Sequence, residues 1–389
     1  MLYFDHNATT FLAPEVADAL TQALRDVYGN PSSIHRQGQK TRQELENARR
    51  TIAGFMTASP QEFVFTSGGT ESNNLAINGL VRNLSPGRKH VITTAIEHPA
   101  ILEPIRQLER EGVDVTYLNV DSKGIIDPDA ILSALRDETV LVSIMHANNE
   151  VGSIQPIRSV ANLIEARRAG GQTIFFHSDG VQAFGKLLVN VRELGVDLYS
   201  VSGHKIFAPK GIGGLFVKSG VPLRSVQLGG RHERGRRAGT ENVPAAVAFA
   251  RAVSLCSNPS ENGVAALRDA FESRLRARGV DFDINGARDC RLPNTSNLLF
   301  PGISAEALVI ALDMGGIAVS TGSACSSGSV EPSHVLLAMG RTGNEARSSV
   351  RFSFGRYNTI EDVGALVEAV SSATRRLGKS SKKERQLVG

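Results

Sequence analysis

The sequence contains few cysteines, little net charge and no long hydrophobic run. Its three cysteines, Cys256, Cys290 and Cys325, lie far apart without a CxxC pair, which excludes a disulfide framework and a cysteine-rich zinc module. Lys and Arg outnumber Asp and Glu by 43 to 39, and a net charge of +4 is too small to indicate a nucleic-acid or membrane partner. No stretch approaches the roughly 20 apolar residues that span a bilayer, and Asp5 interrupts the segment where an export signal is apolar. The sequence therefore predicts a cytoplasmic protein, with neither nucleic acid nor membrane among its partners.

The chain does contain enough apolar sequence for a large core. It has 389 residues, of which 41% are hydrophobic, and this length is typical of two or three domains. Between residues 60 and 220, short runs rich in Val, Ile, Phe and Thr alternate with helical patterns, which predicts an α/β fold with a mostly parallel sheet covered on both faces. The seven strands are expected at 63–66, 90–94, 113–120, 139–146, 173–177, 197–202 and 213–217.

The pattern changes after about residue 256, where a smaller α+β domain is predicted. Its strands are expected near 295–300, 317–320 and 349–354, and its helices near 261–278, 305–314 and 360–377. We expect residues 12–256 to form the large domain and residues 1–11 and 257–389 to form the small one. Residues 378–389 are charged and lack an apolar face, so we expect a flexible tail.

Three segments place polar residues at the ends of predicted strands. Residues 63–77 (FVFTSGGTESNNLAI) join a strand to a helix through a glycine-rich turn, where backbone N–H groups favour an anion, although a simple capped turn has the same pattern. Asp179 and Gln182 follow another strand, where open α/β sheets bind ligands or where Asp caps a helix. Lys205 follows a third strand and is either a Schiff-base nucleophile or a solvated loop residue. Convergence of these residues at one sheet edge favours a catalytic site.

Cys325 lies in TGSACSSGS (321–329), where every other residue is small or carries a hydroxyl group. Such a segment cannot build a core, and an exposed cysteine on a mobile loop is typical of reactive thiols. Cys256 and Cys290 lie near apolar sequence and are expected to be structural. No group of His, Cys and carboxylate residues has ligand spacing, so the sequence predicts no stable metal site.

Ten ordered motifs resemble those of fold type I pyridoxal-phosphate enzymes of the class V aminotransferase group, and within it the cysteine desulfurases of the NifS/IscS type. The motifs cover nearly the whole chain. They are YFDHNATT (3–10), GNPSSIHRQG (29–38), TSGGTESNNLAI (66–77), EHPAIL (97–102), HANNEVGSIQPI (146–157), SDGVQAFGK (178–186), SGHKIFAPKGIGGL (202–215), GGRHERGRRAGTEN (229–242), STGSACSSGSVEPSHVLLAMG (320–340) and SSVRFSFG (348–355).

The resemblance implies how pyridoxal 5'-phosphate is held. Lys205 would form a Schiff base with it, Asp179 would face the pyridine nitrogen, and Gln182 would bind the ring hydroxyl oxygen. His98 would stack on the ring and transfer protons. The phosphate would be bound by Gly69, Thr70, Ser202 and His204, and by Thr240 of the neighbouring subunit, which implies a homodimer.

The resemblance also implies a substrate and an activity. Asn149 would lie near the ring and the substrate L-cysteine, whose carboxylate Arg351 would bind, although alternation along residues 349–354 alone favours an outward-facing Arg351. Cys325, on the catalytic loop 321–331, would attack the substrate sulfur, leaving L-alanine and a Cys325 persulfide. The sulfur would pass to a scaffold protein of the NifU/IscU type for iron–sulfur cluster assembly or thiolation, with Cys325 at most a transient iron–sulfur ligand.

Three alternatives share this sequence pattern. A selenocysteine lyase or another class V aminotransferase could use the same site, but an aminotransferase has no need of Cys325 on a mobile loop. A catalytically silent scaffolding subunit would have no physical need to keep Lys205, Asp179, His98 and Cys325 together. We therefore favour a desulfurase.

Overall fold

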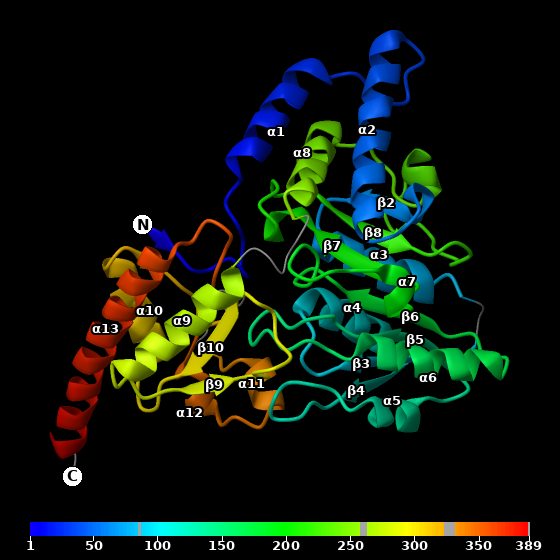
Figure 1. The fold of residues 1–389 in the computed structure, drawn as a ribbon. Helices are drawn as coiled ribbons and strands as arrows, with labels where there is room; N and C mark the ends of the chain where they lie inside the picture. The colour runs from blue at the N-terminus through cyan, green and yellow to red at the C-terminus, as the bar shows by residue number, and fades with distance from the viewer. Residues whose placement is uncertain (85–86, 257–262, 323–330, 388–389) are drawn as a thin grey trace.

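The computed structural model describes residues 1–84, 87–256, 263–322 and 331–387 (Figure 1). Its centre is a seven-stranded sheet with the order β2-β8-β7-β6-β5-β3-β4. Strands β3 to β7 run parallel, whereas β8 is antiparallel to both β7 and β2. The strands are β2 (Phe63–Thr66), β3 (His90–Thr94), β4 (Asp114–Leu118), β5 (Thr139–Ser143), β6 (Phe175–Asp179), β7 (Leu198–Ser202) and β8 (Gly213–Val217). The predicted mostly parallel sheet is confirmed.

Helices cover both faces of this sheet, which explains why its strands are apolar along their whole length. Successive strand residues point to opposite faces, so Val91 and Ile92 belong to different cores, as do Leu141 and Val142. Helices α3 (Gly69–Val81) and α4 (Pro99–Arg110) pack on one face. The other face packs against α2 (Arg36–Phe55), α5 (Pro128–Ala134), α6 (Ile157–Ala169), α7 (Val191–Leu194) and α8 (Val243–Ser254).

A smaller antiparallel sheet with its own core follows in the chain. Strand β10 (Thr295–Leu299) lies between β12 (Ser349–Ser353) and β9 (Asp283–Asn285). Helices α9 (Val264–Ala277), α10 (Ala305–Met314) and α13 (Ile360–Leu387) contribute to this core, whereas α11 (His334–Ala338) and α12 (Gly343–Ala346) pack against Ile96, Met145 and Val151 of the large part. The smaller α+β part is confirmed, and α13 continues as helix through most of the segment predicted to be a tail.

The N-terminus belongs to this smaller part. Strand β1 (Leu2–Tyr3) pairs in parallel with β11 (Ile317–Ala318), and Phe4 is fully buried in the small core. The chain then crosses to the large sheet, where Thr10 N–H donates to the carbonyl of His204. Residues 5–10 therefore connect the small core to the large sheet.

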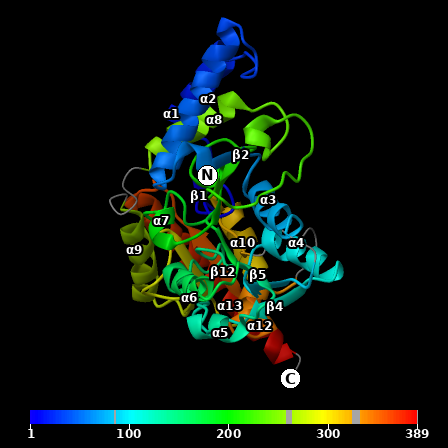
Figure 2. The same ribbon diagram turned by 90° about the vertical axis from the view of Figure 1, so that its right-hand side faces the viewer.

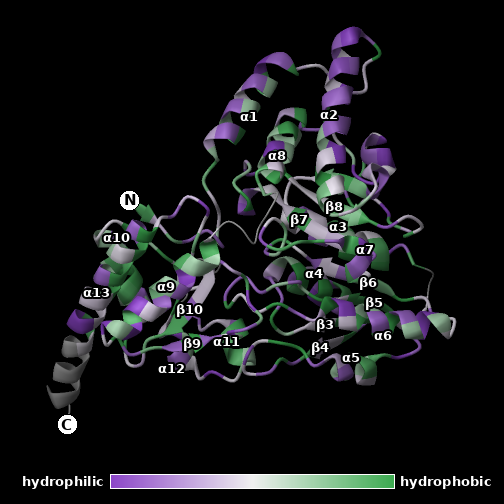
Figure 3. Cartoon of the chain, in the orientation of Figure 1, coloured by the Kyte–Doolittle hydropathy of each residue, from purple (hydrophilic) through white to green (hydrophobic). Residues whose placement is uncertain are grey.

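Helices α1 (Pro14–Asp26) and α2 extend away from the body of the molecule in two perpendicular views (Figures 1 and 2). Their outer ends are largely hydrophilic (Figure 3). Three apolar side chains are nevertheless exposed there: Leu24, Tyr28 and Ile34 are 61%, 76% and 91% accessible.

Candidate active site

A cavity of about 370 Å³ lies between the large sheet and the smaller part of the molecule. The predicted site residues that line it are Gly69, Thr70, His98, Asn149, Asp179, Gln182, Ser202, His204, Lys205 and Arg351. Asn7, Ala8 and Gly322 also line it. The structure therefore brings together ten predicted residues that are dispersed over 283 positions of sequence, from Gly69 to Arg351.

Strand topology explains this convergence. Asp179 ends β6 and Ser202 ends the neighbouring parallel strand β7. Lys205 follows in a short 3-10 helix, η2 (Gly203–Lys205), while His98 is the N-cap residue of α4. Because parallel strands end at the same edge of a sheet, residues that follow different strands meet there.

One end of the cavity is suited to an anion. Gly69 and Thr70 begin the 13-residue helix α3, whose first N–H groups and dipole favour negative charge. A Cβ atom on Gly69 would lie 2.7 Å from Val181 Cγ2, so glycine is required for the close approach. Nearby Ser202 Oγ is buried without a hydrogen-bond partner among the described residues. Burial and then Lys205 lower the pKa of His204 to about 4, so His204 is neutral.

Asp179 presents a carboxylate whose orientation is fixed by two donors. Asn73 Nδ2 donates to Oδ2 at 2.7 Å, and Val181 N–H donates to Oδ1 at 2.9 Å. A buried carboxylate held in this way stabilises a cation placed against it. Asn73 was not predicted as a site residue, although it shares its helix face with the buried residues Ala76, Ile77 and Leu80, where a polar side chain needs a partner.

Lys205 and His98 each bring a nitrogen that can carry a proton to the lining of the cavity. Lys205 Nζ donates to the carbonyl oxygens of Asn7 at 2.6 Å and Ala8 at 2.7 Å. His98 Nδ1 accepts the N–H of Ala100 at 3.0 Å, so the neutral imidazole carries its proton on Nε2. Burial lowers the pKa of His98, with Asp179 opposing and Lys205 reinforcing that shift.

Arg351 is buried on β12 and contacts the N-terminal segment and the loop that contains Asn149. Its Nη2 donates to Asp5 Oδ1 at 2.7 Å and its Nη1 to the carbonyl of Asn149 at 3.0 Å, while Nε is buried without a partner among the described residues. The outward-facing interpretation from strand alternation is wrong. The face of β12 opposite the buried side chains of Val350 and Phe352 lies against the large part of the molecule rather than solvent.

Among the predicted site residues that the structure describes, Thr240 alone does not line the cavity of its own chain. Thr240 is exposed and lies outside the cavity lining. Cys325 lies outside the described residues, but Gly322, three positions before it, lines the cavity.

The other two cysteines are both predicted to be structural. Cys290 is instead exposed, because its loop lies at the surface. Cys256 is buried as expected, and burial raises the pKa of its thiol to about 11.

Neither a metal-binding cluster nor a membrane-spanning helix is found in the described ranges of the chain. No group of three His, Cys, Asp or Glu side chains there could hold a metal ion. None of the helices in that part of the chain is long and apolar enough to cross a membrane.

Residues 2–366 match the family model for class V aminotransferases, and the chain belongs to that family. It is 44% identical over 379 residues to a protein of Dictyoglomus turgidum named cysteine desulfurase IscS, covering 97% of this chain and 95% of the relative. It is also 44% identical over 380 residues to the putative cysteine desulfurase IscS 1 of Bacillus subtilis, covering 97% of this chain and 99% of the relative.

Solved structures resemble the whole fold. A NifS-like protein superposes with a TM-score of 0.90 at 36% identity, covering 97% of this chain and 100% of the other. A NifS-like protein from Rickettsia africae gives 0.84 at 33% identity, covering 96% and 99%. A structure described as SspA in complex with cysteine gives 0.82 at 35% identity, covering 92% and 100%.

Class V aminotransferases use pyridoxal phosphate, and the residues around the cavity fit this cofactor. The unpartnered Ser202 hydroxyl and the start of α3 suit its phosphate, the fixed carboxylate of Asp179 suits a protonated ring nitrogen, and Lys205 supplies a primary amine. The volume of about 370 Å³ lies within the range of roughly 300–1,000 Å³ for small-molecule sites.

Proposed function

We propose that the protein is a pyridoxal-phosphate-dependent cysteine desulfurase that converts L-cysteine to L-alanine and transfers the sulfur to an acceptor. The observation that carries the proposal is the cavity itself. It holds Lys205, Asp179 and His98 on the large side and Arg351 on the small side, beside Gly322, which leads into the Cys325 segment. The names of the relatives support the same substrate.

Each residue has a task that follows from its contacts. Asp179, fixed by Asn73 and Val181, holds positive charge at the ring nitrogen, and pyridoxal phosphate when bound supplies an electron sink for charge developing on the substrate carbon. Gln182 binds the ring oxygen. Gly69, Thr70, Ser202 and His204 bind the phosphate.

The substrate is bound and its protons are moved by three further groups. Arg351 offers a planar pair of donors to the substrate carboxylate, and Asn149 lines the same wall. Lys205 Nζ takes and returns the proton on the substrate carbon. His98, with its proton on Nε2, acts as a donor within the cavity.

The sulfur step is a nucleophilic displacement by Cys325. Its thiolate attacks the substrate sulfur, the new S–S bond forms, and the C–S bond breaks with its electron pair left on carbon. A proton then completes the methyl group of alanine, and Cys325 carries the persulfide. We propose a scaffold protein of the NifU/IscU type as acceptor, and a reducing, cytoplasmic setting for the exchange.

We further propose a homodimer in which Thr240 reaches the phosphate site of the neighbouring subunit. The exposed Thr240 and the exposed apolar residues Leu24, Tyr28 and Ile34 on the projecting α1–α2 pair support this arrangement.

Single-turnover mass spectrometry with L-cysteine and no reductant tests the proposed function. We expect one added sulfur on the peptide that contains Cys325, with alanine appearing in step. Cys325→Ala is the control and should bind cysteine without accumulating sulfur. Alanine without sulfur on that peptide would indicate a lyase, and no alanine from the cofactor-loaded protein would indicate an aminotransferase.

A further inference from the structure

Lys186 is a half-buried lysine at the end of the segment that follows β6, outside the chemistry proposed above. Its Nζ donates to Gln182 Oε1 at 2.6 Å and to Asn7 Oδ1 at 3.0 Å. Within the described residues no carboxylate forms an ion pair with it. Burial, and then the charges of Lys205 and Arg351, lower its pKa well below the usual value.

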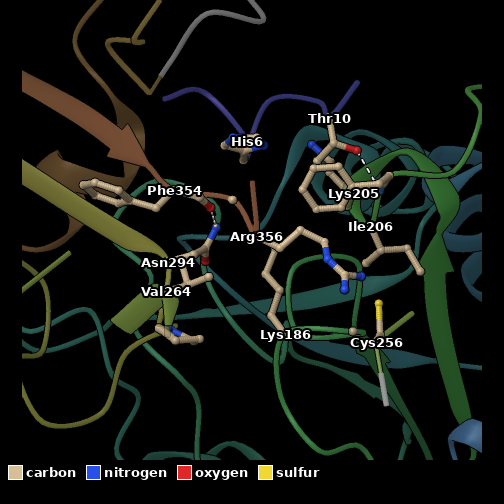
Figure 4. A pocket seen from close by; sticks show the side chains of 14 residues that line it. His6, Thr10, Lys186, Lys205, Ile206, Cys256, Val264, Asn294, Phe354 and Arg356 are labelled. Carbon is tan, nitrogen blue, oxygen red and sulfur yellow. Dashed lines mark hydrogen bonds between the residues drawn. The ribbon is translucent and has the colours of Figure 1, made fainter. Parts of the chain in front are cut away.

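Figure 4 shows Lys186 beside a second cavity, of about 50 Å³, which it lines together with Ile206, Cys256 and Phe354. Lys205 lines both this cavity and the larger one. The two amide oxygens that accept from Lys186 belong to residues of the larger cavity. The side chain of Lys186 thus borders the second cavity and contacts the wall of the first.

These contacts determine which way the amide of Gln182 faces. An amide has an oxygen that accepts and a nitrogen that donates, and an ammonium or amine at Lys186 offers protons to the oxygen. With Oε1 of Gln182 held by Lys186, its Nε2 must face the other way. One of its N–H bonds donates to the carbonyl of Asn7 at 2.9 Å, and the second has no acceptor among the described residues. Gln182 therefore presents a donor to the cavity.

The side-chain amide of Gln182 depends on Lys186 for its orientation more than the side-chain amide of Asn7 does. Asn7 Oδ1 also accepts from Asn294 Nδ2 at 2.9 Å, and Asn7 Nδ2 donates to Thr295 Oγ1 at 2.8 Å. Asn7 would thus keep its orientation without Lys186. In the described part of the chain, Oε1 of Gln182 has Lys186 as its one donor.

We propose that Lys186 is a positioning residue that fixes the amide of Gln182 with its N–H toward the ring oxygen of pyridoxal phosphate. The inference rests on the role proposed for Gln182. Without Lys186, the bond from Gln182 Nε2 to the Asn7 carbonyl is the one contact among the described residues that still orients the amide, so Gln182 holds its second N–H toward the ring oxygen less firmly. Cofactor affinity and the electronic state of the bound ring should both change.

The test measures cofactor binding rather than turnover. The dissociation constant for pyridoxal phosphate is determined by titrating the cofactor-free protein, and the absorbance maximum of the bound cofactor is recorded. We expect Lys186→Met to weaken cofactor binding by about 10-fold or more, which corresponds to the loss of one hydrogen bond to a charged acceptor. The absorbance maximum of the bound cofactor should also shift. Lys186→Arg, which keeps the donors, should restore most of both. Lys123→Met, at an exposed lysine, is the matched control and should change neither.

A double-mutant cycle with Gln182→Leu separates this inference from the proposed function. If Lys186 acts through Gln182, Lys186→Met adds no further loss in the Gln182→Leu background. Equal losses in both backgrounds would overturn the inference and leave the role of Gln182 intact. If Gln182→Leu alone changes neither affinity nor absorbance, the role proposed for Gln182 fails as well. Should Lys186→Met not fold, Lys186→Gln takes its place in the cycle.

Discussion

Glu97, directly before His98, shows how burial sets the state of a single group beside the cavity. Thr94 Oγ1–H and Met145 N–H both donate to Oε1 at 2.8 Å, whereas Oε2 is buried without a partner among the described residues. Burial, reinforced by the charge of Asp179, raises the pKa of this carboxyl from 4.5 to about 8. Glu97 is therefore protonated at neutral pH, and no second carboxylate charge competes with Asp179.

This protonation predicts a pH-dependent stability. Between about pH 4.5 and about pH 8, the folded protein keeps a proton on Glu97 that the unfolded chain releases, so the free energy of unfolding falls as pH rises. Glu97→Gln cannot titrate, and its stability relative to wild type should increase across this window. Urea unfolding at several pH values measures the difference. A difference that is constant with pH would show that Glu97 is ionised in the fold.

Arg351 lines the cavity, and we propose that it binds the substrate carboxylate. Arg351→Ala removes the guanidinium and all of its N–H donors, so KM for L-cysteine should rise about 10- to 100-fold while cofactor affinity changes little. Arg347→Ala, at an exposed arginine four positions earlier, is the matched control. An unchanged KM for Arg351→Ala would assign the carboxylate to another residue.

At the scale of elements, the sequence was most informative where a strand is buried on both faces. The predicted strands 63–66, 90–94 and 213–217 coincide with β2, β3 and β8, because continuous apolar runs bounded by turns admit few other placements. The end of β6 likewise predicted that Asp179 would face a site. The position of Arg351 could not be derived from its strand, since alternation identifies a face but not what covers it.

The ion pair between helix α2 and the 3-10 turn η3 (His232–Gly235) predicts a large effect on stability. Arg49 donates to both carboxylate oxygens of Glu233, at 2.6 and 2.7 Å, and Phe65 N–H donates to the same carboxylate at 2.8 Å. Both side chains are almost completely buried. Arg49→Met leaves the Glu233 charge unpaired and should lower the free energy of unfolding by about 3–5 kcal/mol.

Denaturant unfolding checks this value, and Arg50→Met on the exposed side of the same helix is the control. Adding Glu233→Gln to Arg49→Met removes the unpaired charge and should recover part of the loss. If Arg49→Met is no less stable than Arg50→Met, the pair does not stabilise the contact between α2 and η3.

On the scale of the whole molecule, the cavity exists only because the smaller part packs against the large sheet. Lys205 and Asp179 come from the large sheet, Arg351 and Gly322 from the small part, and Asn7 from the segment that connects them. Thr240 belongs to the large part but is exposed and outside the lining of its own cavity. We propose that its hydroxyl acts in the neighbouring subunit of a homodimer.

Mixed dimers test that assignment. When chains with Lys205→Ala and Thr240→Val are coexpressed with different tags, a purified heterodimer contains one site with Lys205 from one chain and Thr240 from the other. If Thr240 acts on the neighbouring subunit, this site is intact and the heterodimer should show about half of the wild-type activity per dimer, as two-fold symmetry requires. If Thr240 acts in its own chain, one site lacks Lys205 and the other lacks the Thr240 hydroxyl. The heterodimer would then have no more than about half the activity of the Thr240→Val homodimer.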